Sequence, residues 1–280
     1  PRRRGIMSGV VKVGTAFGQV ALPPIAALLI VAYGWRTALF VLGITASVLL
    51  LIAALSMQRP PAPATGTSNI MTGASFVEAR QAPVARVFWT LCATQFLFFP
   101  TLMSVPLHLA VHVIDLGMTQ TLAATMLSVI GAASIAGRLT MGALVDRIGG
   151  KMAYTICLLV LLVSLAALTL ITAHGGLFVV VAIYGFGHGA LFVVVSPTVA
   201  EYFGMRAHGA IFGTVLFFGT LGGSLGPILT GWVFDSFGSY TPAFITLALS
   251  AAIALVLVRT LPSPKSEGLN AQASPTPPAP

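Results

Sequence analysis

Two positively charged residues, Lys12 and Arg138, lie inside long apolar stretches of this sequence. If these stretches span a bilayer, each charge costs at least ~2.5–3.5 kcal/mol on insertion scales and is a candidate for function. Arg138 precedes Asp146 by about two helical turns, which places it roughly 10–12 Å into its stretch. Its planar guanidinium is suited to bind a carboxylate through two hydrogen bonds. Lys12 could add a second positive charge, although both side chains are also long enough to reach back to the membrane surface.

Two histidines, His108 and His112, stand one helical turn apart, at positions i and i+4. Histidine titrates near neutral pH, so the pair could relay a proton or act as a gate. Simple hydrogen bonding at a membrane surface is the alternative, and no metal site is expected because no third ligand is close. We expect the helix that carries them to be broken at Pro100 and Pro106. His188, which lies among glycines, is expected to pack against a neighbouring helix.

The composition indicates which elements position these residues. The chain has 280 residues, of which 57% are hydrophobic and 7% charged, whereas an ordinary soluble domain is about 25% charged. With a mean hydropathy of +0.98, this composition excludes a soluble globule and a disordered chain, and leaves a membrane protein built of helices. The net charge of +8 does not indicate nucleic-acid binding, because aromatic residues are not interleaved with the basic ones.

Apolar stretches of about 20 residues, the length needed to cross a hydrocarbon core, recur along the chain. Eight helical spans are predicted, at 6–32, 36–57, 87–113, 118–143, 152–172, 176–200, 208–233 and 240–261. An even number of spans places both ends of the chain on one side of the membrane. Nearly all Lys and Arg residues fall on that side, with Arg36 opposite. The positive-inside rule therefore predicts that both termini are cytoplasmic, in the plasma or inner membrane of the cell.

The sequence contains an internal repeat, because residues 5–40 match residues 209–244 without gaps. The matched pairs include Gly18 with Gly222, Pro23 with Pro227 and Gly34 with Gly238. The first two predicted spans thus match the seventh and eighth, six spans further along the chain and in the same orientation. Such a match indicates a parallel repeat of two six-helix halves, an arrangement known in transporters. It predicts that the chain holds spans five to twelve of a twelve-span parent, with four preceding helices missing. Similar composition of two glycine-rich helices is the alternative explanation.

A short loop between the fourth and fifth predicted spans carries a recognisable motif. It resembles the G-x-L-x-D-R-x-G-x-K signature of the major facilitator superfamily, and its key residues are Gly142, Asp146, Arg147, Gly149 and Lys151. The glycines would force a tight turn, and Asp146 would meet a neighbouring helix N-terminus or an arginine. Such contacts would hold one conformation of a cytoplasmic gate. An ordinary basic loop is the alternative.

Further stretches resemble the monocarboxylate-transporter branch of this superfamily and its bacterial oxalate–formate antiporter relatives. They lie at 9–15, 34–36, 106–109, 135–142 and 196–204. The resemblance implies that Arg138 matches the eighth-span arginine that faces the substrate carboxylate, and Lys12 is a second substrate-binding candidate. The antiporters carry a lysine in their eleventh span, whereas the matching stretch 217–227 has none. This departure favours a monovalent anion over dicarboxylate exchange.

Glycines and prolines in the first and seventh predicted spans are expected to shape the helices. Small residues let helices approach closely, and prolines bend them. The residues concerned are Gly14, Gly18, Pro23, Gly222, Gly226 and Pro227. Facilitators use such bends where their two halves rock against each other, but static close packing explains the same pattern.

The resemblance implies an all-α membrane protein with the major facilitator fold, N-terminally truncated and with eight transmembrane helices. Residues 1–57 would form the last two helices of the N-terminal six-helix bundle, and residues 58–85 a cytoplasmic linker. Residues 86–262 would form the C-terminal six-helix bundle, followed by a disordered cytoplasmic tail at 263–280.

The function expected from these features is secondary transport of a small organic anion by alternating access, driven by protons or by a counter-anion. No cofactor, metal or enzyme activity is expected, because no hydrolase or kinase motif is present. A proton-coupled exporter of drugs or metabolites with the same fold is one alternative, and it would require an acidic residue within a span. A non-transporting receptor or assembly subunit is another, which a soluble sensor domain would favour.

Overall fold

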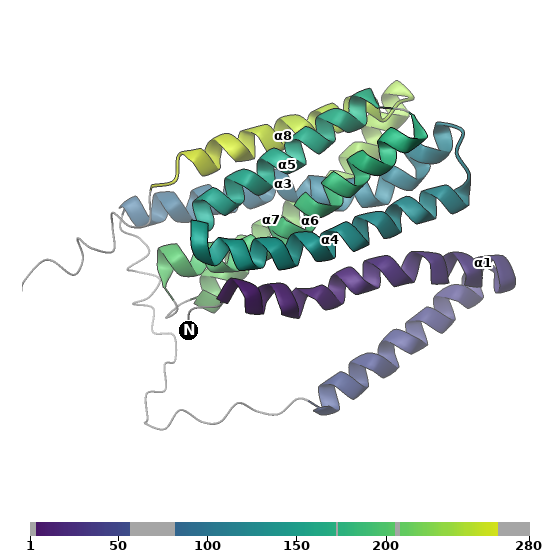
Figure 1. Ribbon diagram of the computed structural model, residues 1–280, viewed down its shortest axis with the longest axis horizontal. Helices are drawn as coiled ribbons and strands as arrows, with labels where there is room; N and C mark the ends of the chain where they lie inside the picture. Colours follow the sequence, from purple (N-terminus) through teal and green to yellow (C-terminus); the bar gives the residue numbers. More distant parts are fainter. Residues whose placement is uncertain (1–3, 57–81, 172, 205–207, 263–280) are drawn as a thin grey trace, which may run out of the picture.

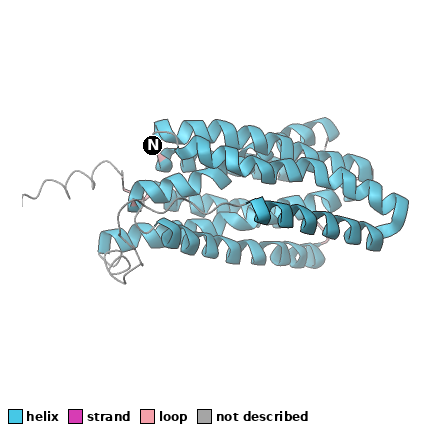
Figure 2. Cartoon of the chain, turned by 90° about the horizontal axis from the view of Figure 1, so that it is seen from below, coloured by secondary structure: helices cyan, strands magenta, loops and turns pink. Residues whose placement is uncertain are grey.

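The computed structural model describes residues 4–56, 82–171, 173–204 and 208–262, and every regular element in these ranges is an α-helix (Figures 1 and 2). The helices are α1 (Arg4–Ser56), α3 (Ala82–Asp115), α4 (Gln120–Ile148), α5 (Gly150–Leu170), α6 (His174–Phe203), α7 (His208–Phe237) and α8 (Thr241–Arg259). All seven are long and apolar enough to cross a membrane. The expected all-α membrane architecture is therefore confirmed.

Helix α1 consists of two limbs that meet at Gly34, where the backbone leaves helical geometry with φ +78°. The limbs correspond to the two spans predicted at 6–32 and 36–57. Figure 1 shows that the second limb turns back and diverges from the first at an angle. Gly238, the repeat partner of Gly34, also has a positive φ of +64° and lies between α7 and α8. Both turns use a backbone conformation that glycine adopts without steric cost.

The prolines lie inside helices without breaking them. The break expected at Pro100 and Pro106 is wrong, because α3 runs without interruption from Ala82 to Asp115. An interior proline removes one hydrogen bond but can be kept where packing supports the helix. Pro24 in α1 likewise leaves the carbonyl of Val20 without its usual donor, and Ser128 of α4 donates to that carbonyl at 3.2 Å.

Helix α4 lies between the first limb of α1 and α6, whereas α3 packs on α7 and α8, and α5 on α6 and α8. Backbone contact at glycines makes these interfaces close. A Cβ atom at Gly131 would lie 2.7 Å from the Val20 nitrogen, and one at Gly226 would lie 2.7 Å from the Pro100 Cα. A Cβ at Gly222 would overlap the Phe96 carbonyl oxygen.

Not every glycine singled out in the sequence has a close neighbour. A Cβ atom at Gly14 would meet nothing within 4 Å among the described residues, and one at Gly18 would meet only Leu22 of its own helix, at 3.8 Å. The second limb of α1 is largely exposed, with large apolar side chains such as Leu50 and Leu55 on its surface. The close packing expected at Gly14 and Gly18 thus stays a prediction.

The bundle has two ends, to which we give names. The basic end is the one where α1 begins, α4 turns into α5 and α8 ends, with Arg147, Lys151 and Arg259 (Figure 1). The opposite end holds Gly34, the α3–α4 turn and the α7–α8 turn. The linker predicted at 58–85 lies outside the described residues except for 82–85, which are helical, and the tail at 263–280 lies wholly outside them.

Candidate functional site: a buried cation pair between three helices

Arg138 is buried in the interior of the helix bundle, with only 2% of its surface exposed. Its Nη1 donates to the backbone carbonyl of Lys12 and to Thr15 Oγ1, the latter at 2.7 Å. Its guanidinium lies over the ring of Phe192, with Cζ 5.4 Å from the ring centroid. The side chain of Arg138 therefore does not reach back to the membrane surface, which was the alternative interpretation of its charge. It projects instead into the junction of α1, α4 and α6.

Lys12 lies beside Arg138 and is half-buried. Its Nζ donates to the backbone carbonyl of Phe192 and lies 5.8 Å from the ring centroid of Phe212. The two cations predicted from the sequence therefore meet at one place, joined through the backbone of α1 and α6. Thr15 and Phe192, which complete this arrangement, were not among the candidate site residues predicted from the sequence.

The charges of this cation pair have no acidic counterpart nearby among the described residues. The four acids in that part of the chain, Asp115, Asp146, Glu201 and Asp235, all lie in the last turn of a helix. Arg138 donates only to neutral oxygens, and its Nε has no hydrogen-bond partner. A buried cation without a counter-charge is costly. The site is thus electrostatically suited to an anion.

The histidine pair lies at the opposite end of the bundle, among aromatic side chains. His108 is 3.3 Å from the hydroxyl of Tyr240 through Nδ1 and 3.1 Å from the carbonyl of Pro227 through Nε2. The ring of His112 packs against Tyr240 and Phe244 at centroid distances of 5.6 and 5.1 Å. This cluster ties α3 to α7 and α8. It shares no partner with Arg138 in the part of the chain that the structure describes.

Tyr240 keeps its proton in this cluster. Burial raises the pKa of its hydroxyl, and the carboxylates of Asp115 and Asp235 raise it further. A protonated hydroxyl can donate to His108 across the 3.3 Å gap. No group of three metal-ligating side chains occurs in the described ranges.

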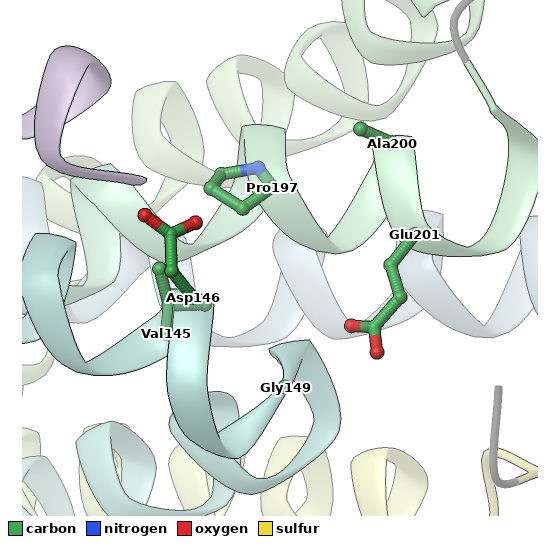
Figure 3. A pocket seen from close by; sticks show the side chains of 6 residues that line it. All are labelled: Val145, Asp146, Gly149, Pro197, Ala200 and Glu201. Atoms are coloured by element: carbon green, nitrogen blue, oxygen red, sulfur yellow. The ribbon is translucent and has the colours of Figure 1, made fainter. Parts of the chain in front are cut away.

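The loop motif lines a pocket of about 220 Å³ at the basic end, formed by the ends of α4 and α6 (Figure 3). Gly149 closes α4 with φ +80°, and Gly150 begins α5 directly after it. The backbone N–H of Gly150 donates to Glu201 Oε2 at 2.6 Å. A carboxylate at a helix N-terminus is favourable because the first N–H groups have no partner within the helix.

Glu201 is thus a carboxylate that meets the α5 N-terminus. The contact expected of Asp146, with a helix N-terminus or an arginine, stays a prediction. Figure 3 shows Asp146 and Glu201 on different helices beside the same pocket. Lys151 donates to the carbonyl of Leu261, just after α8, whereas Arg147 is exposed. Sequence reasoning missed Glu201 because its partner is a backbone group on a helix far away in the chain.

The family model of the Major Facilitator Superfamily matches residues 1–173 and 109–280. The chain belongs to the Major Facilitator Superfamily. The relatives that it matches in this superfamily are transporters and not enzymes. The protein is accordingly a multi-pass membrane protein of a transporter family.

Several relatives within the superfamily carry a more specific name. Monocarboxylate transporter 13 of Rattus norvegicus is 29% identical over 93% of this chain and 60% of its own length. The protein of the same name from Bos taurus is 31% identical over 93% of this chain and 61% of its own. The chain thus spans about three fifths of the length of these relatives.

A solved structure shows the same fold. The superfamily transporter FucP, crystallised in the outward conformation, aligns with a TM-score of 0.65 over 92% of this chain and 68% of its own. Only 16% of the aligned residues are identical. The similarity therefore concerns the arrangement of the helices.

Proposed function

We propose that this protein moves a small organic anion of the monocarboxylate type across a membrane by alternating access. The observation that carries the proposal is the position of Arg138. This arginine is 2% exposed, donates only to neutral oxygens and keeps an unpartnered Nε.

The chemistry of the cation pair favours a carboxylate as cargo. A guanidinium binds a carboxylate through two parallel hydrogen bonds, which supply both energy and orientation. Lys12 adds a second positive charge without such directionality. The names of the relatives from Rattus norvegicus and Bos taurus agree with this choice, because both are monocarboxylate transporters.

The two ends of the bundle would then have different roles. We place the basic end in the cytoplasm of a plasma or inner membrane, following the positive-inside rule. The loop motif, with Gly142, Asp146, Arg147, Gly149 and Lys151, would act there as part of a gate. The hydrogen bond from Gly150 to Glu201 ties the α4–α5 turn to α6 and would hold one state of this gate.

The proposed transport would be driven by a second ion, either a proton in symport or a counter-anion in exchange. His108 and His112 are candidates for handling protons at the opposite end, where they contact Tyr240. An exporter of cationic drugs is disfavoured, because the acids among the described residues all lie in last turns of helices.

Uptake of radiolabelled pyruvate into proteoliposomes tests the proposal, since this small monocarboxylate is ionised at neutral pH and crosses bilayers slowly. The full-length protein is expected to take up pyruvate, and Arg138→Ala to lower kcat/KM by about 100-fold or more, as for loss of one partner of a buried ion pair. Arg138→Lys should fall in between, because it keeps the charge but loses the planar fork.

Arg86→Ala is the matched control, because Arg86 is exposed on α3 at the basic end and should be replaceable without effect. Unchanged uptake by folded Arg138→Ala protein would contradict the proposal. So would a wild-type protein that transports none of formate, pyruvate and benzoate.

A further inference from the structure

Helices α4 and α6 touch at their backbones next to Arg138. A Cβ at Gly137 would overlap the Phe186 carbonyl oxygen, and a Cβ at Gly189 would overlap the carbonyl oxygen of Ser134. Only glycine permits this approach. Arg138 directly follows Gly137, and His188 directly precedes Gly189. The close approach therefore brings Arg138 and His188 to the same interface.

His188 is fully buried, and neither of its ring nitrogens has a hydrogen-bond partner. Its ring packs against Phe192 at a centroid distance of 5.1 Å and against Tyr184 at 5.8 Å. The guanidinium of Arg138 lies over the same Phe192 ring, at 5.4 Å. His188 and Arg138 therefore flank one aromatic side chain. The backbone carbonyl of Leu102 in α3 interacts with the imidazole, but outside the geometry of a full hydrogen bond.

Several polar atoms around this point are unpartnered. They are both ring nitrogens of His188, Nε of Arg138 and Oγ of Ser134. A buried polar atom without a partner costs about 1–3 kcal/mol, so a cluster of them indicates that a further group belongs there. The cluster contains N–H donors from two side chains, and an anion would supply the acceptors.

The groups that face His188 are cationic or neutral. Helix α4 contributes Arg138, and the Lys12 amine of α1 binds the Phe192 carbonyl one turn along α6. The buried titratable side chains of α5, which packs on α6, are Tyr154 and Cys157. None of the acids of the described ranges is nearby, since each lies in the last turn of a helix.

We propose that His188 binds a proton together with the anion held by Arg138. This inference rests on the proposed function, because it requires an anion at Arg138. Arg138 and Lys12 disfavour a third positive charge in the empty site, whereas a bound carboxylate compensates it. Anion and proton then stabilise each other, and each raises the affinity for the other by the same factor. The pair would cross the membrane with no net charge.

Proton uptake on binding tests the inference directly. Pyruvate is titrated calorimetrically into purified full-length protein in two buffers that differ in ionisation enthalpy, which yields the number of protons taken up. The affinity of the wild type for pyruvate is expected to rise on acidification, by up to about tenfold per pH unit. In that pH range, binding of one pyruvate should be accompanied by uptake of close to one proton. His188→Gln is expected to take up none, and its affinity should not depend on pH.

Two further variants make the outcome specific. His208→Gln should keep the proton uptake, because His208 begins α7 at the basic end, where its Nε2 lies 3.2 Å from the hydroxyl of Ser196. His188→Phe fills the space between Tyr184 and Phe192 without a titrating group, and serves where the glutamine variant does not fold.

Proton uptake that persists in either folded His188 variant would overturn the inference, as would a wild type that binds pyruvate without a proton. The proposed function would survive both results. It fails separately if Arg138→Ala binds pyruvate as the wild type does.

Discussion

Arg138 combines nearly complete burial with incomplete hydrogen bonding, and this combination sets it apart from a structural arginine. A structural arginine in a helix bundle is expected to meet an acid or to saturate its donors with carbonyls. Here Nη1 is used by Lys12 and Thr15 of α1, while Nε stays free. The hydrogen bond to Thr15 would orient the guanidinium so that its remaining edge can face an anion.

The role of Thr15 can be tested with Thr15→Val, which keeps the side-chain shape and removes the acceptor. A hydrogen bond to a charged group contributes about 1.5–3 kcal/mol, so the apparent affinity for pyruvate should fall about tenfold or more. The hydroxyl of Thr45 in the same helix bonds only to Val41 of its own backbone. Thr45→Val is therefore the control and should leave binding unchanged; equal effects in both variants would rule out the orienting role.

The helix pairs are held together by glycines at a few points, which determine where side chains meet. Gly137 and Gly189 bring α4 onto α6, and Gly131 brings α4 onto α1. The site of Arg138 lies between these contacts. Its geometry thus depends on backbone spacing as well as on the hydrogen bond from Arg138 to Thr15.

Substitution of Gly189 tests this spacing. Gly189→Ala places a methyl group against the Ser134 carbonyl and should lower the free energy of unfolding by about 1–3 kcal/mol, as overpacking does. It should also reduce pyruvate uptake, because Arg138 and His188 are pushed apart. Gly175 in the same helix has nothing within 4 Å among the described residues. Gly175→Ala should leave thermal stability and uptake intact, and a Gly189→Ala protein that does the same would refute the spacing argument.

Much of this element-scale picture could be predicted from the sequence. Apolar stretches of membrane length predict helices whatever the way in which the helices pack together. The internal repeat also paired Gly34 with Gly238, and both glycines have a positive φ in the structure. The partners of Arg138 could not be predicted, because Thr15 and Phe192 reach it only through helix packing. Continuity of α3 through Pro100 was missed for the same reason, since neighbouring helices support the residues around it.

At the scale of the whole molecule, the two ends of the bundle differ in charge and in chemistry. The basic end carries the loop motif, with the Gly150–Glu201 hydrogen bond beside its pocket. The opposite end carries the cluster of His108, His112 and Tyr240. The cation pair of Lys12 and Arg138 lies between them, where the proposed function would place a substrate site near the middle of the membrane.

The orientation of the bundle can be determined by labelling single cysteines in intact cells. Thr119 and Thr260 are exposed at the opposite end and the basic end respectively. A membrane-impermeant maleimide should label Thr119→Cys directly, and Thr260→Cys only after permeabilisation. The native Cys92 and Cys157 are buried and should stay unlabelled. The reverse pattern would show that the basic end faces outward.

The central claim is that Arg138 holds a carboxylate, and comparing an acid with its neutral amide tests it most directly. Calorimetry on the purified full-length protein should show binding of pyruvate and none of pyruvamide, which has a similar shape but no charge. Arg138→Gln should weaken pyruvate binding by about 100-fold or more, as expected when one partner of a buried pair is removed. Equal affinity of the wild type for acid and amide, or undiminished pyruvate binding by Arg138→Gln, would contradict the account.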